Sequence, residues 1–472
     1  MSVSGETQGL LVGFSDKPDV LLWNRANRHG LVAGATGTGK TITLQVLAQA
    51  FSEAGVPVFA ADIKGDLSGV SIPGTPNEKL LKRAETVGIA LEPAGAPCIF
   101  WDLFGQSGHP IRTTVSEMGP LLLSRLFELN DVQEGVLSIA FHVADKEGLL
   151  LLDLDDLRAL LNYVGENAAE ISRTYGQVSQ ASIGAIQRQI LQLETQGGDQ
   201  FFGEPALRLE DLLRTDIQGR GYINVLSADK LIANPRLYST FLLWLLSELF
   251  EQLPEIGDPE KPRVVFFFDE AHLLFREAPK ALLEKVEQVV RLIRSKGVGI
   301  YFVTQNPADI PDAVLAQLGN RVQHALRAYT PSEQKGLKAA ADSFRPNPDF
   351  DTAEKIQTLG VGEAVVSLLD AKGIPSMAAH CLIRPPASRL GPVTPEERKA
   401  QMATSPVGAL YNASVNRDSA YEILTRRAEA AVDAAEAEDA VKPAPKSRSR
   451  AEPAPARSQR QGAFEALAVS LL

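Results

Sequence analysis

Residues 29–49 read HGLVAGATGTGKTITLQVLAQ, with glycines and threonines placed between two apolar runs. Leu31–Ala33 is a short apolar run typical of a buried strand, and apolar residues recur at helical spacing over residues 42–51. Between them, Gly34, four further residues and then Gly39-Lys40-Thr41 match the pattern G-x-x-x-x-G-K-[ST]. The motif stands between a strand and a helix, which is the context it requires, so the stretch predicts a loop that binds phosphate groups.

The residue types of this loop suit the phosphates of ATP. Glycines let backbone N–H groups turn inward around an anion, and the next helix adds its free N–H groups and the positive end of its dipole. Lys40 is expected to reach the β- and γ-phosphates, and the Thr41 hydroxyl to coordinate a magnesium ion, Mg2+. A chance glycine turn is the structural alternative. The predicted nucleotide-binding residues are Gly34, Ala35, Thr36, Gly37, Thr38, Gly39, Lys40 and Thr41.

A second stretch, RVVFFFDEAHLLF at residues 263–275, supplies the acidic groups that ATP hydrolysis needs. Val264–Phe268 is an unbroken apolar run, which indicates a strand buried on both faces. Asp269 follows at its carboxyl end, where open α/β sheets bind ligands, and we expect it to hold Mg2+ directly or through water. Glu270 is predicted to polarise the attacking water. The alternative for Asp269 is that it only caps the next helix.

A third stretch, RLIRSKGVGIYFVTQNPADIP at residues 291–311, contains most of the remaining candidates for catalysis, and Arg321 follows it. Val298–Val303 reads as another buried strand, and Gln305 follows its end. If this strand lies beside the Asp269 strand, Gln305 faces the γ-phosphate and can sense it or orient water. Arg294 and Arg321 are candidates for the positive group that stabilises the transferring phosphoryl, and a neighbouring subunit can supply such a group. A solvated helix end or a structural ion pair is the alternative for either arginine.

Composition narrows the class of protein. The 472 residues carry a net charge of −11, which argues against coating nucleic acid broadly but leaves room for a local basic patch. We find no apolar run of the ~18–20 residues that span a bilayer, and MSVSGETQGL lacks the pattern of a signal peptide. We therefore expect a cytoplasmic protein with no membrane partner. Cys98 and Cys381 are expected to be thiols, and no histidine shows metal-ligand spacing with them.

Strand-like runs alternate with helical patterns, which predicts an α/β fold with a mostly parallel sheet. The runs lie at residues 31–33, 56–61, 98–103, 221–226, 263–268, 298–304, 321–328 and 363–369. Residues 112–215 are mainly helical instead, and a plausible capping box pairs Thr114 with Glu117. A connection of about 100 residues is long for a crossover, so we interpret this block as a helical insertion.

After residue 395 the alternation of strand-like and helical patterns weakens. Residues 442–461 are rich in Pro, Ala, Ser and Arg, which is typical of a disordered linker. The last residues, GAFEALAVSLL, have the pattern of a short amphipathic helix, with a frayed terminus as the alternative. The predicted organisation is the first part of the ATPase core at 1–111, the helical insertion at 112–215, the second part of the core at 216–395, C-terminal helices at 396–441, the linker at 442–461 and a terminal helix at 462–472.

Taken together, GATGTGKT, the strand ending in DEAH, and the R-S-K-G-V-G turn before a strand ending in TQNP resemble the HerA–FtsK superfamily of ring-forming P-loop ATPases. DIKGDLSG, TTVSEMGPLLLSRLFELNDVQEGVL and SAYEIL carry a closer similarity to bacterial HerA-C-domain-like proteins over roughly residues 8–427. The resemblance implies a RecA/FtsK-like fold, phosphate binding by Gly34–Thr41, metal binding by Asp269, catalysis by Glu270 and sensing by Gln305. It also implies that Arg294 is an arginine finger. The motifs of the RNA helicases that are named for DEAH are not found.

Two functions of different classes follow. The first is a Mg2+-dependent ATPase motor, a homo-oligomer and by resemblance a hexamer, that moves on or remodels double-stranded DNA. The second is an ATP-driven switch or assembly factor whose helical insertion holds a protein partner. A nucleotide-binding scaffold without hydrolysis is a weaker third hypothesis, because a scaffold has no need of the water-positioning pair Glu270 and Gln305. A response of ATP turnover to duplex DNA separates the first two.

Overall fold

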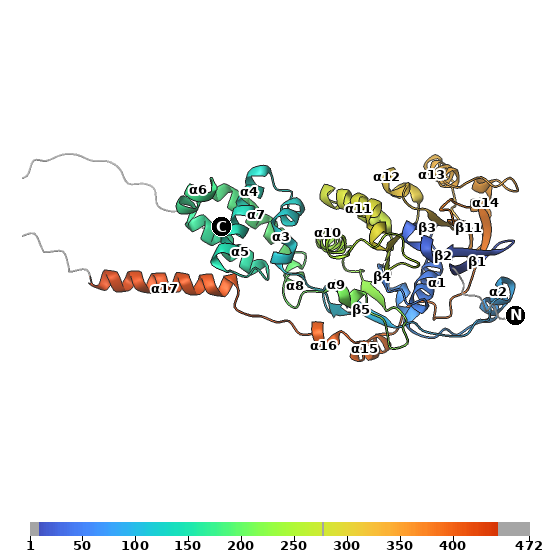
Figure 1. Cartoon of the computed structure of the whole chain (residues 1–472), viewed down its shortest axis with the longest axis horizontal. Coiled ribbons are helices and arrows are strands. Elements are labelled where there is room, and N and C mark those ends of the chain that lie inside the picture. Colours follow the sequence, from blue (N-terminus) through green and yellow to red (C-terminus); the bar gives the residue numbers. More distant parts are fainter. Residues whose placement is uncertain (1–8, 276–277, 442–472) are drawn as a thin grey trace, which may run out of the picture. The chain divides into compact units, whose positions relative to one another are not determined.

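The computed structural model describes residues 9–275 and 278–441 (Figure 1). The chain divides into two compact units, Met1–Leu424 and Thr425–Leu472. The first unit contains the sheet and the helices around it. The described part of the second unit belongs to one helix, α17 (Ala420–Val441). The predicted linker at 442–461 and the predicted terminal helix at 462–472 lie outside the described residues.

The described strands form one sheet, in the order β2-β1-β12-β11-β10-β3-β9-β8-β4-β7-β5-β6. From β10 to β6 every neighbouring pair of described strands is parallel, and the pairs from β2 to β10 are antiparallel. The prediction of an α/β fold with a mostly parallel sheet is confirmed. The strands are β1 (Gly9–Phe14), β2 (Pro18–Leu22), β3 (Gly30–Ala33), β4 (Val58–Asp62), β5 (Cys98–Asp102), β6 (His109–Pro110), β7 (Ile223–Ser227), β8 (Val264–Phe268), β9 (Val298–Thr304), β10 (Asn320–Gln323), β11 (Glu363–Ser367) and β12 (Ala379–Ile383).

The central strands are apolar throughout because both faces of the sheet are covered. Along β8 the side chains alternate between two hydrophobic clusters: Val264, Phe266 and Phe268 belong to one, and Val265 and Phe267 to the other. Helix α1 (Lys40–Glu53) covers the second face. Helices α10 (Pro235–Gln252) and α11 (Lys280–Leu292) cover the first. Each fully buried Phe contributes about 1.5–3 kcal/mol through burial, so these strands form the centre of the core.

Two features of the sheet differ from the sequence prediction. The run at 321–328 forms only the short strand β10, because the chain leaves the sheet at His324 and passes beside the phosphate loop. The antiparallel strands β1, β2 and β12 were not predicted, since glycine or proline interrupts the first two. Gly13 of β1 is required by close backbone approach: a Cβ there would lie 2.3 Å from the carbonyl oxygen of Leu382.

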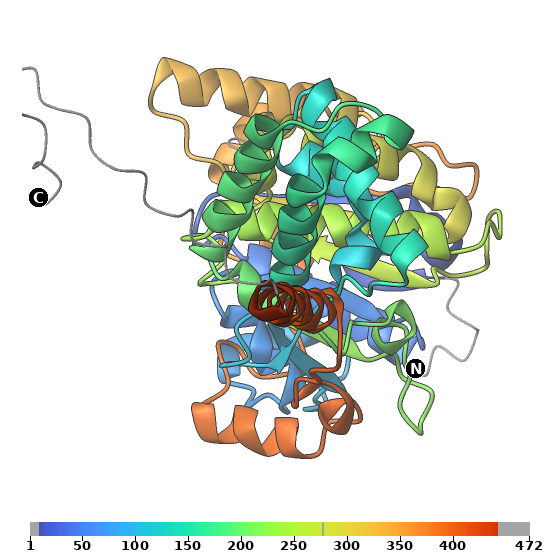
Figure 2. The ribbon, with the colours of Figure 1, turned by 90° about the vertical axis from the view of Figure 1, so that its left-hand side faces the viewer.

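Between β6 and β7 the chain forms a group of helices that packs into the same hydrophobic cluster as α10. Helices α4, α5 and α7 contact one another (Figure 2). The predicted capping box is confirmed, because Thr114 Oγ1 accepts from the Glu117 N–H at 3.1 Å and the Glu117 carboxylate accepts from the Thr114 N–H. The helices are α3 (Val115–Leu126), α4 (Asp131–Glu147), α5 (Leu154–Glu166), α6 (Ala168–Tyr175), α7 (Gln180–Glu194), α8 (Gly198–Phe201) and α9 (Leu209–Leu212).

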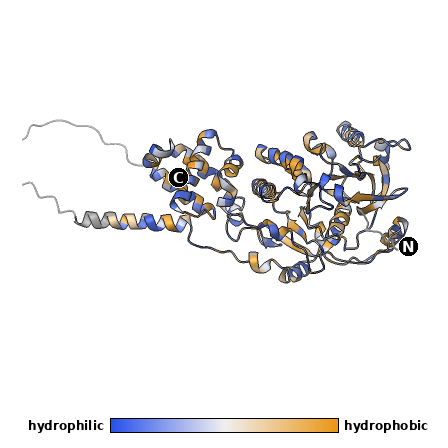
Figure 3. Cartoon of the chain, viewed as in Figure 1, coloured by the Kyte–Doolittle hydropathy of each residue, from blue (hydrophilic) through white to orange (hydrophobic). Residues whose placement is uncertain are grey.

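The remaining described helices lie on the surface of the sheet or follow it. In Figure 3 helix α11 carries both colours, because its apolar face, which includes Leu282, Val286 and Val289, is buried and its polar face is exposed. We find no helix in the described parts of the chain with the length and apolar character needed to traverse a bilayer. These helices are α2 (Glu78–Val87), α12 (Asp312–Leu315), α13 (Pro331–Asp342), α14 (Thr352–Thr358), α15 (Pro395–Ala403) and α16 (Gly408–Tyr411).

Asn224 of β7 is a buried polar residue that ties the sheet to the end of the helical group. Its Oδ1 accepts from Trp101 Nε1 at 2.9 Å, and its Nδ2 donates to the carbonyl oxygens of Leu212 at 3.0 Å and Val58 at 3.2 Å. Replacing Asn224 with Ala leaves three buried polar groups without this partner. We expect Asn224→Ala to lower the free energy of unfolding by about 2–4 kcal/mol, measured by urea denaturation.

The matched control is Asn416→Ala, at an exposed asparagine, which should change the free energy of unfolding by less than about 0.5 kcal/mol. Equal effects of the two substitutions would contradict a structural role for the Asn224 hydrogen bonds.

Candidate ATPase site

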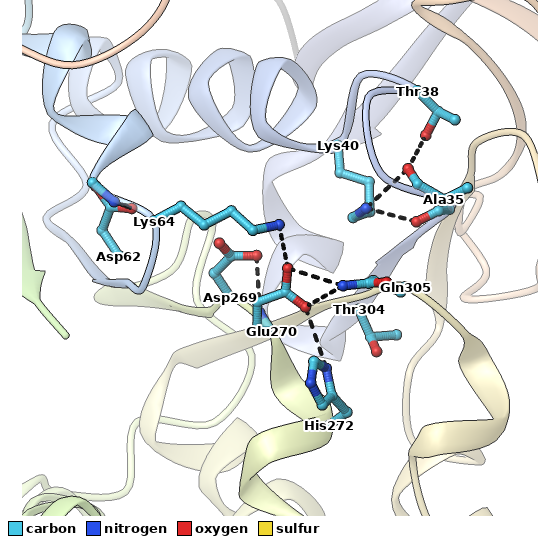
Figure 4. A network of polar contacts seen from close by, with 12 residues as sticks. Ala35, Thr38, Lys40, Asp62, Lys64, Asp269, Glu270, His272, Thr304 and Gln305 are labelled. Atoms are coloured by element: carbon cyan, nitrogen blue, oxygen red, sulfur yellow. Dashed lines mark hydrogen bonds and ion pairs between the residues drawn. The ribbon is translucent and has the colours of Figure 1, made fainter. Parts of the chain in front are cut away.

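The phosphate loop, residues 34–39, joins β3 to the first turn of α1. Gly39 is in the left-handed region with φ 119° and immediately precedes Lys40, the first residue of α1. Lys40 Nζ lies inside the loop and donates to the carbonyl oxygens of Gly34 at 2.6 Å and Ala35 at 3.1 Å, and Thr38 Oγ1 donates to Ala35 at 2.7 Å (Figure 4). The loop is therefore a closed turn with a buried ammonium at the positive end of a helix, which suits an anion.

Strand β9 lies between the phosphate-loop strand β3 and the acidic strand β8. Ala33 pairs with Thr304 across β3 and β9, and Phe268 pairs with Phe302 across β8 and β9. All three strands run parallel, so their carboxyl ends meet at one edge of the sheet. This edge brings the phosphate loop, Gln305 and the two acidic residues together. The condition placed on Gln305, that its strand lies beside the Asp269 strand, is met.

Asp269 and Glu270 follow β8 directly. Burial and the neighbouring Glu270 carboxylate raise the pKa of Asp269 to about 6. Burial and the nearby Lys64 ammonium lower the pKa of Lys40, while Glu270 and Asp269 oppose that shift. Because Asp269 and Glu270 both act on the pKa of Lys40, the three side chains belong to one polar site inside an apolar fold.

Glu270 is the centre of a polar network at this edge (Figure 4). It is 4% exposed and has a left-handed backbone conformation with φ 48°, which turns its side chain across the sheet edge. Its carboxylate forms an ion pair with Lys64 and accepts from Gln305 Nε2 at 3.2 and 3.4 Å. His272 Nδ1 lies 3.2 Å from Oε2. Burial acts to raise the pKa of Glu270, but Lys64 and Gln305 hold it below its usual value.

The donor groups at this edge fit Mg2+ held jointly by protein and nucleotide. The described residues contain no group of three His, Cys, Asp or Glu side chains that could hold a metal ion alone. Mg2+ commonly takes one or two protein oxygens and completes its shell with phosphates and water. The Thr41 hydroxyl, one residue into α1, and the half-buried Asp269 carboxylate are oxygen donors of that kind.

The two candidate arginines lie elsewhere. Arg294 precedes β9, whereas Gln305 follows it, and seven strand residues at about 3.3 Å each separate the two ends. The Arg294 guanidinium donates to Asp258 at 3.1 Å. Arg321 donates to the backbone carbonyls of Leu318, Ser343 and Leu315 at 2.8–3.1 Å. Within one chain neither arginine is brought to Glu270, and Arg321 is engaged in holding backbone.

Sequence reasoning assigned no role to Lys64 and Asp62, which lie at the end of β4. Strand β4 pairs with β8 on the side away from β9, so its end lies beside Asp269. Asp62 accepts from the N–H groups of Gly65 at 2.8 Å and Leu67 at 3.0 Å, which fixes the loop that carries Lys64. Burial and the Asp269 carboxylate raise the pKa of Asp62 to about 7. The signal was present as DIKGD after an apolar run, but only the strand order makes it part of this site.

His324 packs against the phosphate loop. Its Nε2 lies 2.8 Å from Thr43 Oγ1, and its Nδ1 lies 2.8 Å from the carbonyl oxygen of Glu363. A carbonyl only accepts, so we assign the proton to Nδ1 and let Nε2 accept from Thr43. A Cβ on Gly34 would lie 2.5 Å from His324 Cβ, which explains the glycine at that position. The imidazole is therefore a neutral structural group under the loop.

Burial lowers the pKa of His324 from 6.5 to about 4. The unfolded chain consequently binds more protons than the folded one between these values, and stability falls as the pH drops from about 6.5 towards 4. Between pH 7 and pH 5 we expect the wild type to lose about 2 kcal/mol more stability than His324→Asn, measured by denaturant unfolding at each pH. Parallel pH dependence of the two proteins would show that His324 is not held neutral.

Known proteins with a similar sequence cover most of this chain. The chain is 24% identical over 365 residues to the DNA double-strand break repair helicase HerA of Saccharolobus solfataricus, which covers 73% of this chain and 62% of that protein. It is 22% identical over 371 residues to the HerA of Sulfolobus acidocaldarius, covering 76% of this chain and 66% of the relative. The chain therefore spans less than two thirds of the length of these curated relatives.

Among solved structures, the plasmid coupling protein TrwB in complex with ADP and Mg2+ is similar with a TM-score of 0.52 and 16% identity, covering 82% of this chain and 93% of that chain. TrwB with the non-hydrolysable GTP analogue GDPNP gives a TM-score of 0.52 at 15% identity, covering 82% and 93%. These likenesses show the fold. The family model described as "Helicase HerA-like C-terminal" matches residues 9–466, and the chain belongs to this family of HerA–FtsK-type P-loop ATPases.

Proposed function

We propose that this protein is a Mg2+-dependent ATPase motor that hydrolyses ATP to ADP and phosphate and acts on double-stranded DNA as a ring of identical subunits, a hexamer. The observation that carries the proposal is the contact between Glu270 and Gln305 at the sheet edge that also bears the phosphate loop. A base and an amide beside a triphosphate site are what a water-activating centre requires.

Each residue of the site has a separate role in the proposed hydrolysis of ATP. The loop amides of residues 34–39 and the Lys40 ammonium bind the phosphates and offset charge on the transferring phosphoryl group. Thr41 and Asp269 hold Mg2+, which supplies positive charge at the phosphates. Glu270 accepts the proton of the attacking water, and Gln305 orients that water or senses the terminal phosphate.

Support for DNA as the polymer comes from the relatives that are named DNA double-strand break repair helicases. One observation favours the second candidate, an ATP-driven switch that acts on a protein partner. Residues 112–215 contain 16 acidic and 8 basic side chains, so this helical group repels phosphate backbones. In a DNA motor these helices must face away from the DNA, whereas in a switch they are the surface that holds the partner.

The deciding measurement is the ATP turnover of the purified full-length chain with and without duplex DNA at low salt. The motor predicts a rise of at least several-fold that weakens as salt increases, because phosphate contacts are screened and exchanged for counterions. Mass measurement with a non-hydrolysable ATP analogue should detect the ring. Turnover that ignores DNA over the whole titration would reject the motor and favour the protein-directed switch.

Two substitutions separate binding from chemistry. Glu270→Gln should retain ATP affinity but lower turnover by roughly 100-fold or more, because the amide cannot accept a proton. Lys40→Ala should weaken nucleotide binding itself, since it removes the ammonium from the loop. Fluorescent-nucleotide titration and phosphate release measure the two quantities. Undiminished phosphate release from the Glu270→Gln variant would exclude Glu270 as the general base.

Arg294 is proposed to act on the site of a neighbouring subunit, because its own sheet edge is opposite the phosphate loop. Arg294→Ala and Glu270→Gln subunits should each be nearly inactive alone. Mixed rings contain interfaces with both an intact Arg294 and an intact Glu270, so mixing should restore measurable turnover. The readout is ATP turnover against mixing ratio. Mixtures without any recovery would assign Arg294 to its ion pair with Asp258 alone.

A further inference from the structure

The ion pair between Lys64 and Glu270 has a role that the ATPase chemistry above does not use. Lys64 is part of the loop after β4, and its side chain is 39% exposed, whereas that of Glu270 is 5% exposed. The ammonium therefore enters the site from the solvent side and ends on a buried carboxylate (Figure 4).

This ion pair leaves the carboxylate fully engaged. Oε1 contacts Lys64 and lies 3.4 Å from Gln305 Nε2. Oε2 lies 3.2 Å from Gln305 Nε2 and 3.2 Å from His272 Nδ1. A general base must offer a free lone pair to its water within about 2.6–3.2 Å. In this arrangement each carboxylate oxygen already has a partner, and the Lys64 ammonium takes a lone pair that a water would need.

The loop that carries Lys64 is anchored to two other parts of the chain. Behind Lys64, Asp62 binds the N–H groups of Gly65 and Leu67. The 3₁₀ helix Asp66–Ser71 that follows receives a hydrogen bond from Gln401 Nε2 of α15 to Ser71 Oγ at 3.0 Å. Val393 N donates to Ser68 Oγ at 3.0 Å. These hydrogen bonds connect the loop that carries Lys64 to the segment around residues 393–401.

Lys64 also has alternative partners. The carboxylates of Asp269 and Asp66 attract the same ammonium as Glu270 does, and the Lys40 ammonium repels it. Lys64 is the exposed member of the pair, so water can replace Glu270 around its ammonium, whereas Glu270 is buried. The ammonium can therefore leave the carboxylate for solvent or for a neighbouring carboxylate, which a releasable restraint requires.

We propose that Lys64 is a positioning residue that restrains Glu270: the ion pair keeps the carboxylate from the attacking water, and its rupture releases the base. The inference rests on the proposed ATPase function and adds a brake on the basal reaction. DNA or a neighbouring subunit stimulates turnover, in this account, by drawing the Lys64 side chain away from Glu270.

The test is the substitution Lys64→Met, which keeps the length of the side chain and removes its charge. Without DNA, we expect kcat for ATP to rise by about 1.5-fold to fivefold, the range that the loss of one partly exposed ion pair allows. KM should change little, because the phosphate loop is intact. The ratio of DNA-stimulated to basal turnover should fall, since part of the release has already occurred.

Two further variants exclude a general effect of charge or stability. Lys64→Arg keeps a cation within reach of the carboxylate and should remove most of the increase in kcat. Lys280→Met breaks an exposed ion pair with Glu284 in α11, at 3.6 Å, outside the site, and should leave kcat unchanged. Thermal unfolding of all variants confirms that they are folded.

The outcomes distinguish the brake from the function on which it rests. If the wild type hydrolyses ATP and Lys64→Met is equally fast or slower, the brake is overturned and the ATPase function stands. A slower Lys64→Met variant would mean that Lys64 assists the reaction. A wild type without turnover and an active Lys64→Met variant supports the brake. If the wild type and Lys64→Met are both folded and neither hydrolyses ATP, with or without DNA, both proposals are overturned.

Discussion

The placement of β9 between β3 and β8 is the constraint on which the site depends. All three strands are parallel, so the phosphate loop, Gln305 and the acidic pair all emerge at one edge. Hydrogen bonding between the strands fixes their register, and a slip of one residue would turn every side chain to the other face. Buried phenylalanines from β8 in both core clusters oppose such a slip. The apolar core thus holds the strand ends that carry the site in register.

The electrostatics of this edge are those of a site prepared for a cation and an anion together. Three carboxylates lie beside the ammonium groups of Lys40 and Lys64: those of Asp62 and Glu270 are buried, and that of Asp269 is half-buried. Burial raises the pKa of both aspartates, and a bound divalent cation would favour their charged forms again. Left-handed geometry at Glu270 adds local strain that the surrounding contacts hold in place.

The two ends of β9 carry different parts of the proposed machine. Gln305 at its carboxyl end contacts the base, whereas Arg294 at its amino end is paired with Asp258 on the opposite edge. A single chain cannot bring them together, because the strand between them is rigid. In a ring of identical subunits the arginine edge of one copy can face the phosphate edge of the next, and this supports the oligomeric form of the proposal.

The sequence by itself determined the glycine loop after β3, the acidic residues after β8, the strand that ends before Gln305 and the α/β class, because each depends on a local pattern: glycine spacing, an unbroken apolar run, a polar residue at its end. Tertiary structure decided the rest. Lys64 and His324 join the site only because β4 pairs with β8 and the chain turns out of the sheet after β10. Strand order and the path of a loop depend on packing between segments hundreds of residues apart, which no local periodicity records.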